Sequence, residues 1–538
     1  MTTFTNFRFA VDADGIALAT WDMPDRSMNV ITPEVMEELA RIVDTVAGDE
    51  AIKGCVIASG KEAFSGGADL TMLQGLSAQY ARLAKEKGEE EAMRFFFEES
   101  RKLSLLYRRL ETCGKPFAVA VHGVCLGGAF ELALACHFRV LSDSDATRVG
   151  LPEIKVGLFP GAGGTQRVAR LMQTGDALQM LFKGEQIRAL MARNMGLAHA
   201  VVPRDQVVQA AKDWIRQGGS AVAPWDGQGF KLPSNKVYSA AGMQIWPAAN
   251  AIYRRETQDN YPAAYAILEA VYQGLQLPMD LALKVESRWF AKILRSKEAA
   301  AMIRTLFISM QELNKGARRP KDVPPTKLRK VGIVGAGFMG ASVAYVTAHA
   351  GLDVVLIDRD VEAAEKGKAH SHKLMSDQVM KGRAKTADRD ALMSRITATA
   401  DYAALADCDL VVEAVFEDPK VKAEVIEKVE AAIGPDCIFA SNTSTLPISG
   451  LAKHAKNAGQ FIGIHFFSPV EKMMLVEIIM GRETGDRALA TALDYVRAIR
   501  KTPIVVNDSR GFFANRCVLA YILEGHLMFL EGVPPAMI

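Results

Sequence analysis

The feature that most constrains this fold is a glycine-rich turn, Gly335-Ala-Gly-Phe-Met-Gly340, between a strand-like run and a helical pattern. The apolar run Arg329–Val334 precedes the turn, a helical pattern follows it to residue 350, and Asp358 ends the next apolar run. Strand, glycine turn, helix and acidic residue in this order are typical of a dinucleotide-binding βαβ unit. The pattern therefore predicts a doubly wound parallel sheet over residues 328–507.

Each glycine of the turn has a separate physical role in binding a dinucleotide. Gly335 permits the tight turn, Gly337 lets the backbone approach the pyrophosphate, and Gly340 lets helix and strand pack closely. The N-terminus of the next helix offers unpaired N–H groups and a partial positive charge to the phosphates. Asp358 can accept hydrogen bonds from the ribose hydroxyls and would repel a 2′-phosphate, which favours NAD over NADP. The neighbouring Arg359 leaves NADP as the alternative.

The rest of the second half continues this alternation of apolar runs with helical patterns, which indicates a Rossmann-type domain. Further apolar runs lie at residues 354–357, 410–415, 438–440, 461–466 and 504–506. Residues 512–530 favour one helix, which Gly532-Val-Pro-Pro535 ends. A lone helix after a complete sheet has little to pack against. We therefore expect residues 508–538 to be the incomplete start of an all-α domain.

The composition fits a folded chain and excludes some classes of partner. The 538 residues are 49% hydrophobic, so the chain can bury a core and general disorder is excluded. Lysine and arginine number 64 against 62 aspartate and glutamate, and the net charge of +2 gives no field to hold nucleic acid. The 7 cysteines include no CxxC pair, so we expect free thiols in a reducing compartment and no metal site.

No segment has the pattern of a targeting or membrane-spanning sequence. Residues 1–8 lack a basic region followed by an apolar core. The most apolar long stretch, residues 117–141, contains two histidines, a glutamate and an arginine, which argue against a membrane span. We therefore expect a cytoplasmic protein with no integral membrane segment.

The first half alternates β-like runs with helical stretches, which indicates a separate α/β domain over residues 1–205. Residues 33–46 favour a helix, with Thr32 as its N-cap and Pro33 at its first position. Residues 77–111 favour one long, charged helical segment. Strands are expected at residues 15–21, 53–58 and 117–121.

A helical extension and linker are expected over residues 206–327. Residues 218–250 are rich in Gly, Pro, Ser and Asn and favour a loop, whereas residues 263–313 return to helical periodicity. Pro, Gly and charged residues then concentrate at 315–327, which predicts the boundary between the two halves.

Four motifs after the glycine turn resemble 3-hydroxyacyl-CoA dehydrogenase and occur in the order of that family. They are Val411-Val-Glu-Ala-Val-Phe-Glu-Asp418, Ala440-Ser-Asn-Thr-Ser-Thr445, Ile464-His-Phe-Phe-Ser-Pro469 and Leu475-Val-Glu-Ile478. The resemblance covers about residues 328–532. It implies the oxidation of a hydroxyl group with NAD as the cofactor.

The resemblance implies roles for individual residues of these motifs. His465 corresponds to the catalytic base and Glu477 to the carboxylate that orients and charges it. Such a base takes the hydroxyl proton as a hydride leaves to NAD, and the carboxylate stabilises the imidazolium. Ser444 and Asn515 correspond to substrate-binding positions. The cofactor-binding positions correspond to Gly335, Gly337, Met339, Gly340, Asp358, Glu417, Lys422, Ser444 and Ser468, where many relatives carry Asn in place of Ser468.

The first half carries two glutamates in glycine-rich surroundings. Gly127 and Gly128 end a strand and open a helix, where exposed N–H groups can cradle an oxygen that gains negative charge. Glu131 lies in the first turn of that helix, and Glu153 follows Pro152 on a loop that can fold back against it. Two facing carboxylates can hold and activate a water. The alternative is a purely structural pair, although an unpaired buried glutamate is costly.

The segments around these glutamates resemble the enoyl-CoA hydratase, or crotonase, superfamily over about residues 10–205. The resemblance implies a crotonase-like β-β-α spiral and an oxyanion hole made by the backbone N–H groups of Ala68 and Gly128. It also implies that Glu131 and Glu153 are the catalytic carboxylates. Many members lack one or both glutamates, so the presence of both implies hydratase chemistry. The matching segments are Phe64–Leu70, Lys115–Leu132 and Gly150–Thr165.

A hydratase followed by a dehydrogenase resembles the α-subunit family of the fatty-acid β-oxidation multienzyme complex. The resemblance implies hydration of trans-2-enoyl-CoA, oxidation of the L-3-hydroxyacyl-CoA product to 3-ketoacyl-CoA, and a thiolase β subunit as partner. The chain is short at its C-terminus relative to that family, so hydration is the activity more firmly expected. The alternatives are a crotonase-fold isomerase or hydrolase fused to an NAD-binding module, and a non-catalytic scaffold.

Overall fold

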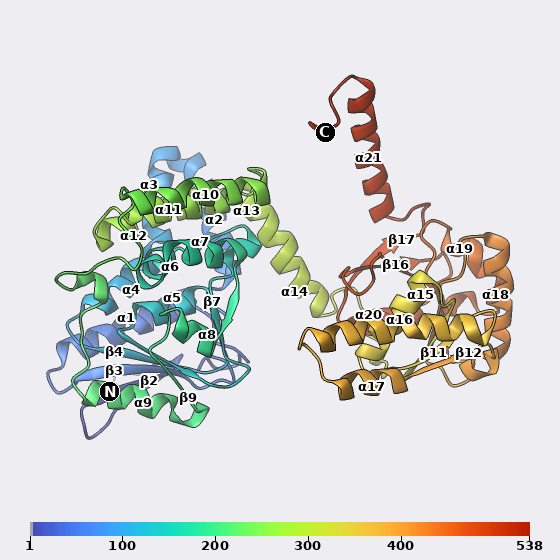
Figure 1. The fold of residues 1–538 in the computed structure, drawn as a ribbon, viewed down its shortest axis with the longest axis horizontal. Coiled ribbons are helices and arrows are strands. Elements are labelled where there is room, and N and C mark those ends of the chain that lie inside the picture. The colour runs from blue at the N-terminus through green and yellow to red at the C-terminus, as the bar shows by residue number, and fades with distance from the viewer. Residues whose placement is uncertain (1–3) are drawn as a thin grey trace. The chain divides into compact units, whose positions relative to one another are not determined.

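The computed structural model describes residues 4–538, apart from the side chain of residue 74 (Figure 1). The chain folds into two compact units that divide between Ile308 and Ser309. The division follows a π-helical segment, η4 (Ile303–Ile308), inside the region expected to be helical extension and linker. Each unit has two clusters of buried hydrophobic residues, the larger of which in the first unit is called the main core.

The first unit contains two sheets. Its strands are β1 (Phe7–Val11), β2 (Ile16–Trp21), β3 (Gly54–Ser59), β4 (Phe117–Val121), β5 (Val124–Leu126), β6 (Phe138–Ser142), β7 (Arg148–Gly150), β8 (Gln186–Arg188) and β9 (Ala200–Val202). The larger sheet has the order β1-β2-β3-β4-β6-β9, in which β1 runs antiparallel to β2 and the other neighbours are parallel. The smaller sheet has the order β5-β7-β8. After β4 the chain passes between the two sheets, as expected for the predicted spiral.

The helices of the first unit agree with the sequence in some places and differ in others. They are α1 (Pro33–Gly48), α2 (Leu70–Lys87), α3 (Glu89–Ser100), α4 (Lys102–Thr112), α5 (Gly128–Ala135), α6 (Gly164–Leu171), α7 (Thr174–Lys183), α8 (Ala189–Asn194), α9 (Val207–Arg216), α10 (Ala240–Thr257), α11 (Pro262–Gly274), α12 (Met279–Leu294) and α13 (Lys297–Met302). Helix α1 begins as predicted, because the side chain of Thr32 accepts a hydrogen bond from the N–H of Val35 at 3.3 Å.

Two expectations for helices were wrong. The segment at 77–111 is not one helix, because the chain breaks at Gly88, with a φ of 90°, and again at Arg101. The expected loop at 218–250 contains the start of α10, where the side chain of Ser239 accepts a hydrogen bond from the N–H of Gly242. Helical propensity alone did not reveal the glycine break or this cap.

The larger sheet is covered on both faces. On β4, Phe117 and Val119 pack into the main core, whereas Ala118 and Ala120 pack against α9. Their alternation follows the period of two of a strand.

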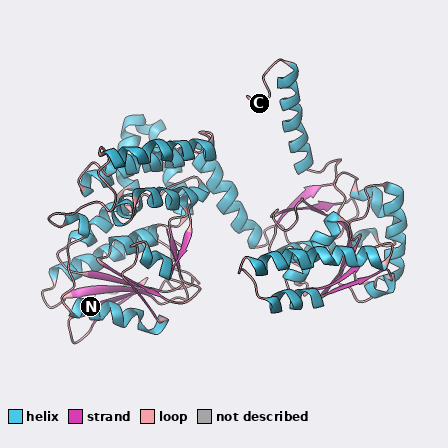
Figure 2. Cartoon of the chain, in the orientation of Figure 1, coloured by secondary structure: helices cyan, strands magenta, loops and turns pink. Residues whose placement is uncertain are grey.

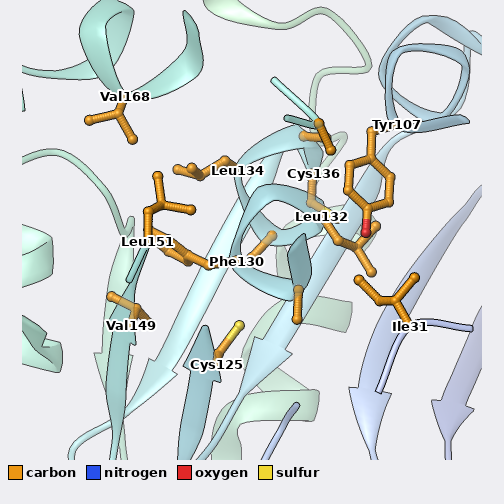
Figure 3. Packing of buried hydrophobic residues seen from close by; sticks show 14 of the residues in the cluster. Ile31, Tyr107, Cys125, Phe130, Leu132, Leu134, Cys136, Val149, Leu151 and Val168 are labelled. Carbon is orange, nitrogen blue, oxygen red and sulfur yellow. The ribbon is translucent and has the colours of Figure 1, made fainter. Parts of the chain in front are cut away.

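Helix α5 lies inside the main core. All of its residues, Gly128–Ala135, are buried. Figure 3 shows its side chains between Val149 and Leu151 on one side and Ile31 and Tyr107 on the other. A helix packed on every side has little freedom to move, so the groups at its N-terminus have fixed positions.

The second unit is a single sheet of eight strands with helices on both faces (Figure 2). Its strands are β10 (Lys330–Val334), β11 (Asp353–Ile357), β12 (Ile396–Thr399), β13 (Leu410–Glu413), β14 (Ile438–Ser441), β15 (Phe461–Phe466), β16 (Leu475–Met480) and β17 (Thr502–Asn507). The order is β12-β11-β10-β13-β14-β15-β16-β17. The sheet is parallel from β12 to β15, as predicted, but β16 runs antiparallel to β15 and parallel to β17. The connection from β15 to β16 is too short to hold a crossover helix, so the strand reverses.

The residues of β11 alternate between two cores on opposite faces of this sheet. Val354 and Leu356 share one core with α15 and α16, whereas Val355 and Ile357 share the other with α18. This double coverage is typical of a doubly wound domain. The helices are α14 (Ser309–Asn314), α15 (Phe338–His349), α16 (Val361–Met380), α17 (Thr386–Ser394), α18 (Pro419–Ala432), α19 (Ile448–Leu451), α20 (Asp486–Ala498) and α21 (Ala514–Leu530).

Helix α21 has no buried residue, and Leu519 and Tyr521 are 57% and 82% exposed. The sequence predicted this exposed apolar helix. Among the described helices, none has the combination of length and apolar character that a bilayer crossing requires.

Candidate active sites

Two loops of the first unit meet at the start of helix α5. Gly127, the N-cap of α5, and Gly67, on the facing loop, have φ values of 55° and 97°, which favour glycine. A Cβ on Gly128 would lie 3.9 Å from the backbone nitrogen of Ala68. In the described part of the chain, the N–H groups of Ala68 and Gly128 donate to no acceptor. Two adjacent, available N–H groups can hold an oxygen that gains negative charge.

Glu131 lies one turn into α5 and is 3% exposed. Its Oε1 accepts hydrogen bonds from the N–H groups of Ala162 and Gly164, both at 2.7 Å. Burial, together with the charges of Glu153 and Glu286, raises the pKa of Glu131 well above its ordinary value. The two hydrogen bonds fix the carboxyl group in position, and the raised pKa favours its protonated form.

Glu153 lies in a 3-10 helix, η1 (Glu153–Val156), and not in the open loop expected from the sequence. Its Oε1 lies 3.1 Å from the position that a Cβ on Gly127 would take, so the carboxyl group reaches the start of α5. Its Oε2 is buried and has no hydrogen-bond partner among the described residues. Burial, with the charge of Glu286, raises the pKa of Glu153 to about 8.

A third buried carboxyl group, not predicted from the sequence, lies beside this pair. Glu286 lies on α12 and is fully buried. It accepts hydrogen bonds from the N–H groups of Gly163 and Thr165, which belong to the start of α6. The signal available was an acidic residue on the apolar face of a helical pattern, three residues from Leu283 and four from Phe290.

The glycines of the turn in the second unit are required for different reasons. A Cβ on Gly335 would lie 2.6 Å from the carbonyl oxygen of Ala414, and a Cβ on Gly340 would lie 1.7 Å from that of Gly335. A Cβ on Gly337 would meet no atom of the described residues within 4 Å. Packing therefore excludes a side chain at the first and last glycine, whereas the open space at Gly337 suits the close approach of a ligand.

Asp358 binds the glycine turn from the end of β11. Its Oδ2 accepts a hydrogen bond from the N–H of Ala336 at 2.7 Å, and its Oδ1 accepts one from the N–H of Arg359 at 2.7 Å. Each oxygen keeps lone-pair capacity for a ribose hydroxyl. The guanidinium of Arg359 is exposed and pairs with Asp360 at 3.2 Å. The turn and this carboxylate fit NAD.

His465 and Glu477 are direct cross-strand partners on β15 and β16. His465 Nδ1 lies 2.8 Å from Glu477 Oε2, and the other oxygen of Glu477 accepts hydrogen bonds from the N–H groups of Phe513 and Ala514 at 3.0 and 2.8 Å. Burial opposes ionisation, but the hydrogen bond with His465 and those from the two N–H groups hold the pKa of Glu477 below its ordinary value. An ionised carboxylate only accepts, so Nδ1 carries the proton, which in the neutral imidazole leaves a lone pair on Nε2.

A chain of hydrogen bonds joins four further residues predicted at the dehydrogenase site. Lys422 Nζ lies 3.3 Å from Glu417 Oε2, and Glu417 Oε1 accepts from the N–H of Ser444 at 2.8 Å. Asn515 Nδ2 donates to the carbonyl oxygen of Ser444 at 2.9 Å. The structure therefore brings Glu417, Lys422, Ser444 and Asn515 together.

The residue that holds Lys422 was not predicted from the sequence. Glu413, which is fully buried at the end of β13, lies 3.0 Å from Lys422 Nζ through both carboxylate oxygens and also accepts from the hydroxyl of Ser441. Its signal was an acidic residue inside an apolar run. Burial opposes ionisation of Glu417, but the hydroxyl of Thr443 and the charge of Lys422 hold the pKa of Glu417 below its ordinary value.

Two predicted cofactor positions lie apart from this chain of hydrogen bonds. Met339 is half-buried in the first turn of α15, and Ser468 is exposed after the end of β15. Within residues 4–538, no group of three or more His, Cys, Asp and Glu side chains is placed to hold a metal ion.

The two halves of the chain match two different families of known proteins. Residues 12–222 match the family described as enoyl-CoA hydratase/isomerase, and residues 330–509 match the 3-hydroxyacyl-CoA dehydrogenase NAD binding domain. The fatty acid oxidation complex subunit alpha of Shewanella frigidimarina is 37% identical over 537 residues, which are 99% of this chain and 73% of that protein. Its counterpart from Shewanella baltica is 37% identical over 528 residues, 96% of this chain and 71% of that protein.

The chain belongs to the fatty acid oxidation complex subunit alpha family. It is a bifunctional enzyme of fatty-acid β-oxidation, an enoyl-CoA hydratase and a 3-hydroxyacyl-CoA dehydrogenase that uses NAD. The activities, the cofactor and the fold class predicted from the sequence are confirmed. The chain is also similar to the solved structure of (S)-3-hydroxybutyryl-CoA dehydrogenase from Ralstonia eutropha, with 36% identity over 39% of this chain and 74% of that chain, at a TM-score of 0.38.

Proposed function

We propose that Glu131 and Glu153 together hydrate trans-2-enoyl-CoA to L-3-hydroxyacyl-CoA, with the N–H groups of Ala68 and Gly128 holding the thioester oxygen. The observation that carries this proposal is the buried Oε2 of Glu153, which has no partner among the described residues. A buried acceptor left without a donor is rare in native proteins, and a reacting water satisfies it.

The proposed hydration balances without a cofactor. A proton passes from the water to one carboxylate as its oxygen bonds to C3 of the enoyl group, and C2 receives a proton from the pair. Negative charge that develops on the thioester oxygen is held by the two N–H groups. The elevated pKa values of Glu131 and Glu153 suit a pair that shares one proton near neutral pH.

For oxidation, we propose that His465 takes the proton from the C3 hydroxyl through Nε2. NAD, when bound, supplies the hydride acceptor. Glu477 fixes the tautomer and stabilises the imidazolium that forms. Asn515 and Ser444 lie within one hydrogen-bonded chain and are proposed to orient the substrate, while Glu417, Lys422, Met339 and Ser468 are proposed to line the cofactor.

An assay with crotonyl-CoA tests the two proposed steps in order. Without NAD, the chain is expected to produce 3-hydroxybutyryl-CoA; with NAD, it is expected to form NADH from that product. An isomerase or hydrolase fused to an NAD module would leave crotonyl-CoA unhydrated, and a scaffold would leave both substrates unchanged.

We also infer a thiolase β subunit as the partner, because the relatives are named as subunits of a complex. Co-expression with such a subunit and size-exclusion chromatography test this inference. Location in the cytoplasm is likewise our inference. All seven cysteines are free thiols, and five of them are buried, which suits a reducing compartment.

Replacing Asp358 by Ala is expected to weaken NADH binding about tenfold or more, because a charged acceptor for the ribose is lost. The preference for NADH over NADPH should narrow as well. Fluorescence titration with both cofactors measures these effects. Asp353→Ala, at the opposite end of the same strand, is the matched control and should bind both cofactors as the parent chain does. Equal affinity of the parent chain for the two cofactors would contradict the assignment.

Hydration is expected to decline as the pH rises through about 8, the value to which burial raises the pKa of Glu153. A carboxyl group with a raised pKa keeps its proton at neutral pH and loses it above that value, after which the pair has no proton to deliver. Initial rates of crotonyl-CoA hydration measured across the pH range test this. A rate that stays constant well above pH 8 would show that no shared proton is needed.

A further inference from the structure

The proton transfers proposed for hydration do not use the third buried carboxyl group, Glu286. It belongs to α12, far along the chain from the two glutamates proposed as catalytic, and its side chain is fully buried. Its oxygens accept hydrogen bonds from the N–H groups of Gly163 and Thr165 and from the hydroxyl of Thr165. Burying a carboxyl group in this way is costly unless its lone pairs are satisfied, as they are here.

Four consecutive N–H groups at the start of α6 alternate between two carboxyl groups. Ala162 and Gly164 donate to Glu131, whereas Gly163 and Thr165 donate to Glu286. The same short peptide segment is therefore held from both sides.

The segment has little freedom to adjust. Gly163 has a φ of 99°, and a Cβ there would lie 1.9 Å from Nη1 of Arg167. Arg167 is itself fixed, because its Nη1 donates to the carbonyl oxygen of Ala162 and its Nε donates to Glu111 at 3.0 Å, with both side chains fully buried. A displacement of Glu286 is thus transmitted to the N–H groups that hold Glu131.

We propose that Glu286 is a positioning residue for hydration, which acts by holding the Ala162–Thr165 segment that in turn holds Glu131. The proposal rests on the proposed role of Glu131. It also gives the helical extension a part in the first reaction, because α12 supplies this side chain from outside the crotonase-like domain.

The charge of Glu286 adds a second effect on the same site. The charged groups around it are Glu131 on α5, Glu153 on η1, and Arg167 and Arg170 on α6. Burial raises the pKa of Glu286 to about 7, although the hydrogen bonds from Thr165 and Gly163 and the charge of Arg167 oppose the rise. When ionised, Glu286 disfavours a second negative charge nearby and so raises the pKa of both proposed catalytic glutamates.

The test compares Glu286→Gln and Glu286→Asp with the parent chain. E286Q removes the charge and one of the two acceptors, so kcat for crotonyl-CoA hydration is expected to fall about 10- to 100-fold. KM should stay within about twofold, because Glu286 is bound to Gly163 and Thr165 and is not among the groups proposed to hold the substrate. The pH profile should move to lower pH, since the pair loses a neighbouring negative charge. E286D keeps the charge and should restore the parental pH profile.

The matched control is Glu298→Gln, the same change at an exposed position of α13 in the same extension. E298Q should leave kcat, KM and the pH profile unchanged. An E286Q variant that melts like the parent chain and keeps the parental kcat and pH profile would overturn the proposal. A fall in kcat without any shift of the pH profile would reduce Glu286 to a structural residue and would equally overturn it.

A second variant decides the matter if E286Q does not fold. Thr165→Val removes one donor to Glu286 and should lower kcat several-fold at constant KM, while Thr165→Ser should restore it. Parental kcat in T165V would overturn the proposal in that case. Failure of the proposed function is distinguishable, because it would be seen as full activity in Glu131→Gln, whatever the behaviour of the variants at 286 and 165.

Discussion

Replacing Glu153 by Gln should lower the turnover of crotonyl-CoA hydration about 10²-fold or more, as for the loss of a positioned acid or base. The amide has nearly the same shape but cannot hold and release the proton. In the variant an NH₂ group replaces one of the two oxygens, so a donor takes the place of an acceptor at the site proposed for the water. Glu131→Gln should cause a loss of the same order, because its amide oxygen can still accept from the N–H groups of Ala162 and Gly164 but the amide cannot hold and release a proton.

Binding measurements separate lost chemistry from lost structure. The affinity for 3-hydroxybutyryl-CoA, measured by calorimetry, should stay within a few-fold of the parental value in E153Q, because the proposed oxyanion hole is untouched. Glu185→Gln, at an exposed glutamate paired with Lys183, is the matched control and should hydrate at the parental rate. Hydration by E153Q at the parental rate would show that this glutamate is not part of the catalytic pair.

The sequence predicted the second unit well because its signals are local. The glycine turn at Gly335–Gly340 and the buried runs of β10, β11 and β15 each have their own local pattern. Connections that contain helices then place the strands in one sheet. The reversal of β16 was not predicted, since the direction of a strand depends on the connection and not on the residues within it. The breaks at Gly88 and Arg101 show the same limit, because helical propensity continues through residues at which the backbone turns.

The candidate sites divide in the same way. His465 and Glu477 are twelve positions apart in the sequence, and one antiparallel register makes them neighbours. Glu286 could not be found by this route, because it lies on a different helix and contacts its partners only after α12 packs on α6. Its only signal in the sequence is an acidic residue on the apolar face of a helical pattern, where burial of a charge is costly.

The hydrogen bonds of Glu477 connect its pair with His465 to helix α21. Its Oε1 accepts from the N–H groups of Phe513 and Ala514, where α21 begins, while its Oε2 accepts from His465. The carboxylate therefore orients the imidazole and anchors the first turn of the helix that carries Asn515. A change at Glu477 is expected to affect both the imidazole of His465 and the first turn of α21. A change at His465 therefore tests the base more directly.

His465→Gln should lower the oxidation of 3-hydroxybutyryl-CoA by NAD about 10²- to 10⁴-fold, because it removes the imidazole proposed to take the hydroxyl proton. NADH formation is measured on the same preparation as crotonyl-CoA hydration, which should be unchanged and serves as an internal control. NADH affinity should also be kept, since the glycine turn and Asp358 are untouched.

Two further variants separate the base from its orientation. Glu477→Gln can donate its amide to Nδ1 of His465, which would move the imidazole proton to Nε2 and remove the lone pair that takes the hydroxyl proton, for a loss of about 10²- to 10⁴-fold. His454→Gln, at an exposed histidine of the same unit, is the matched control and should oxidise at the parental rate. Parental oxidation in His465→Gln would mean that the hydroxyl proton leaves by another route and that the pair on β15 and β16 is structural.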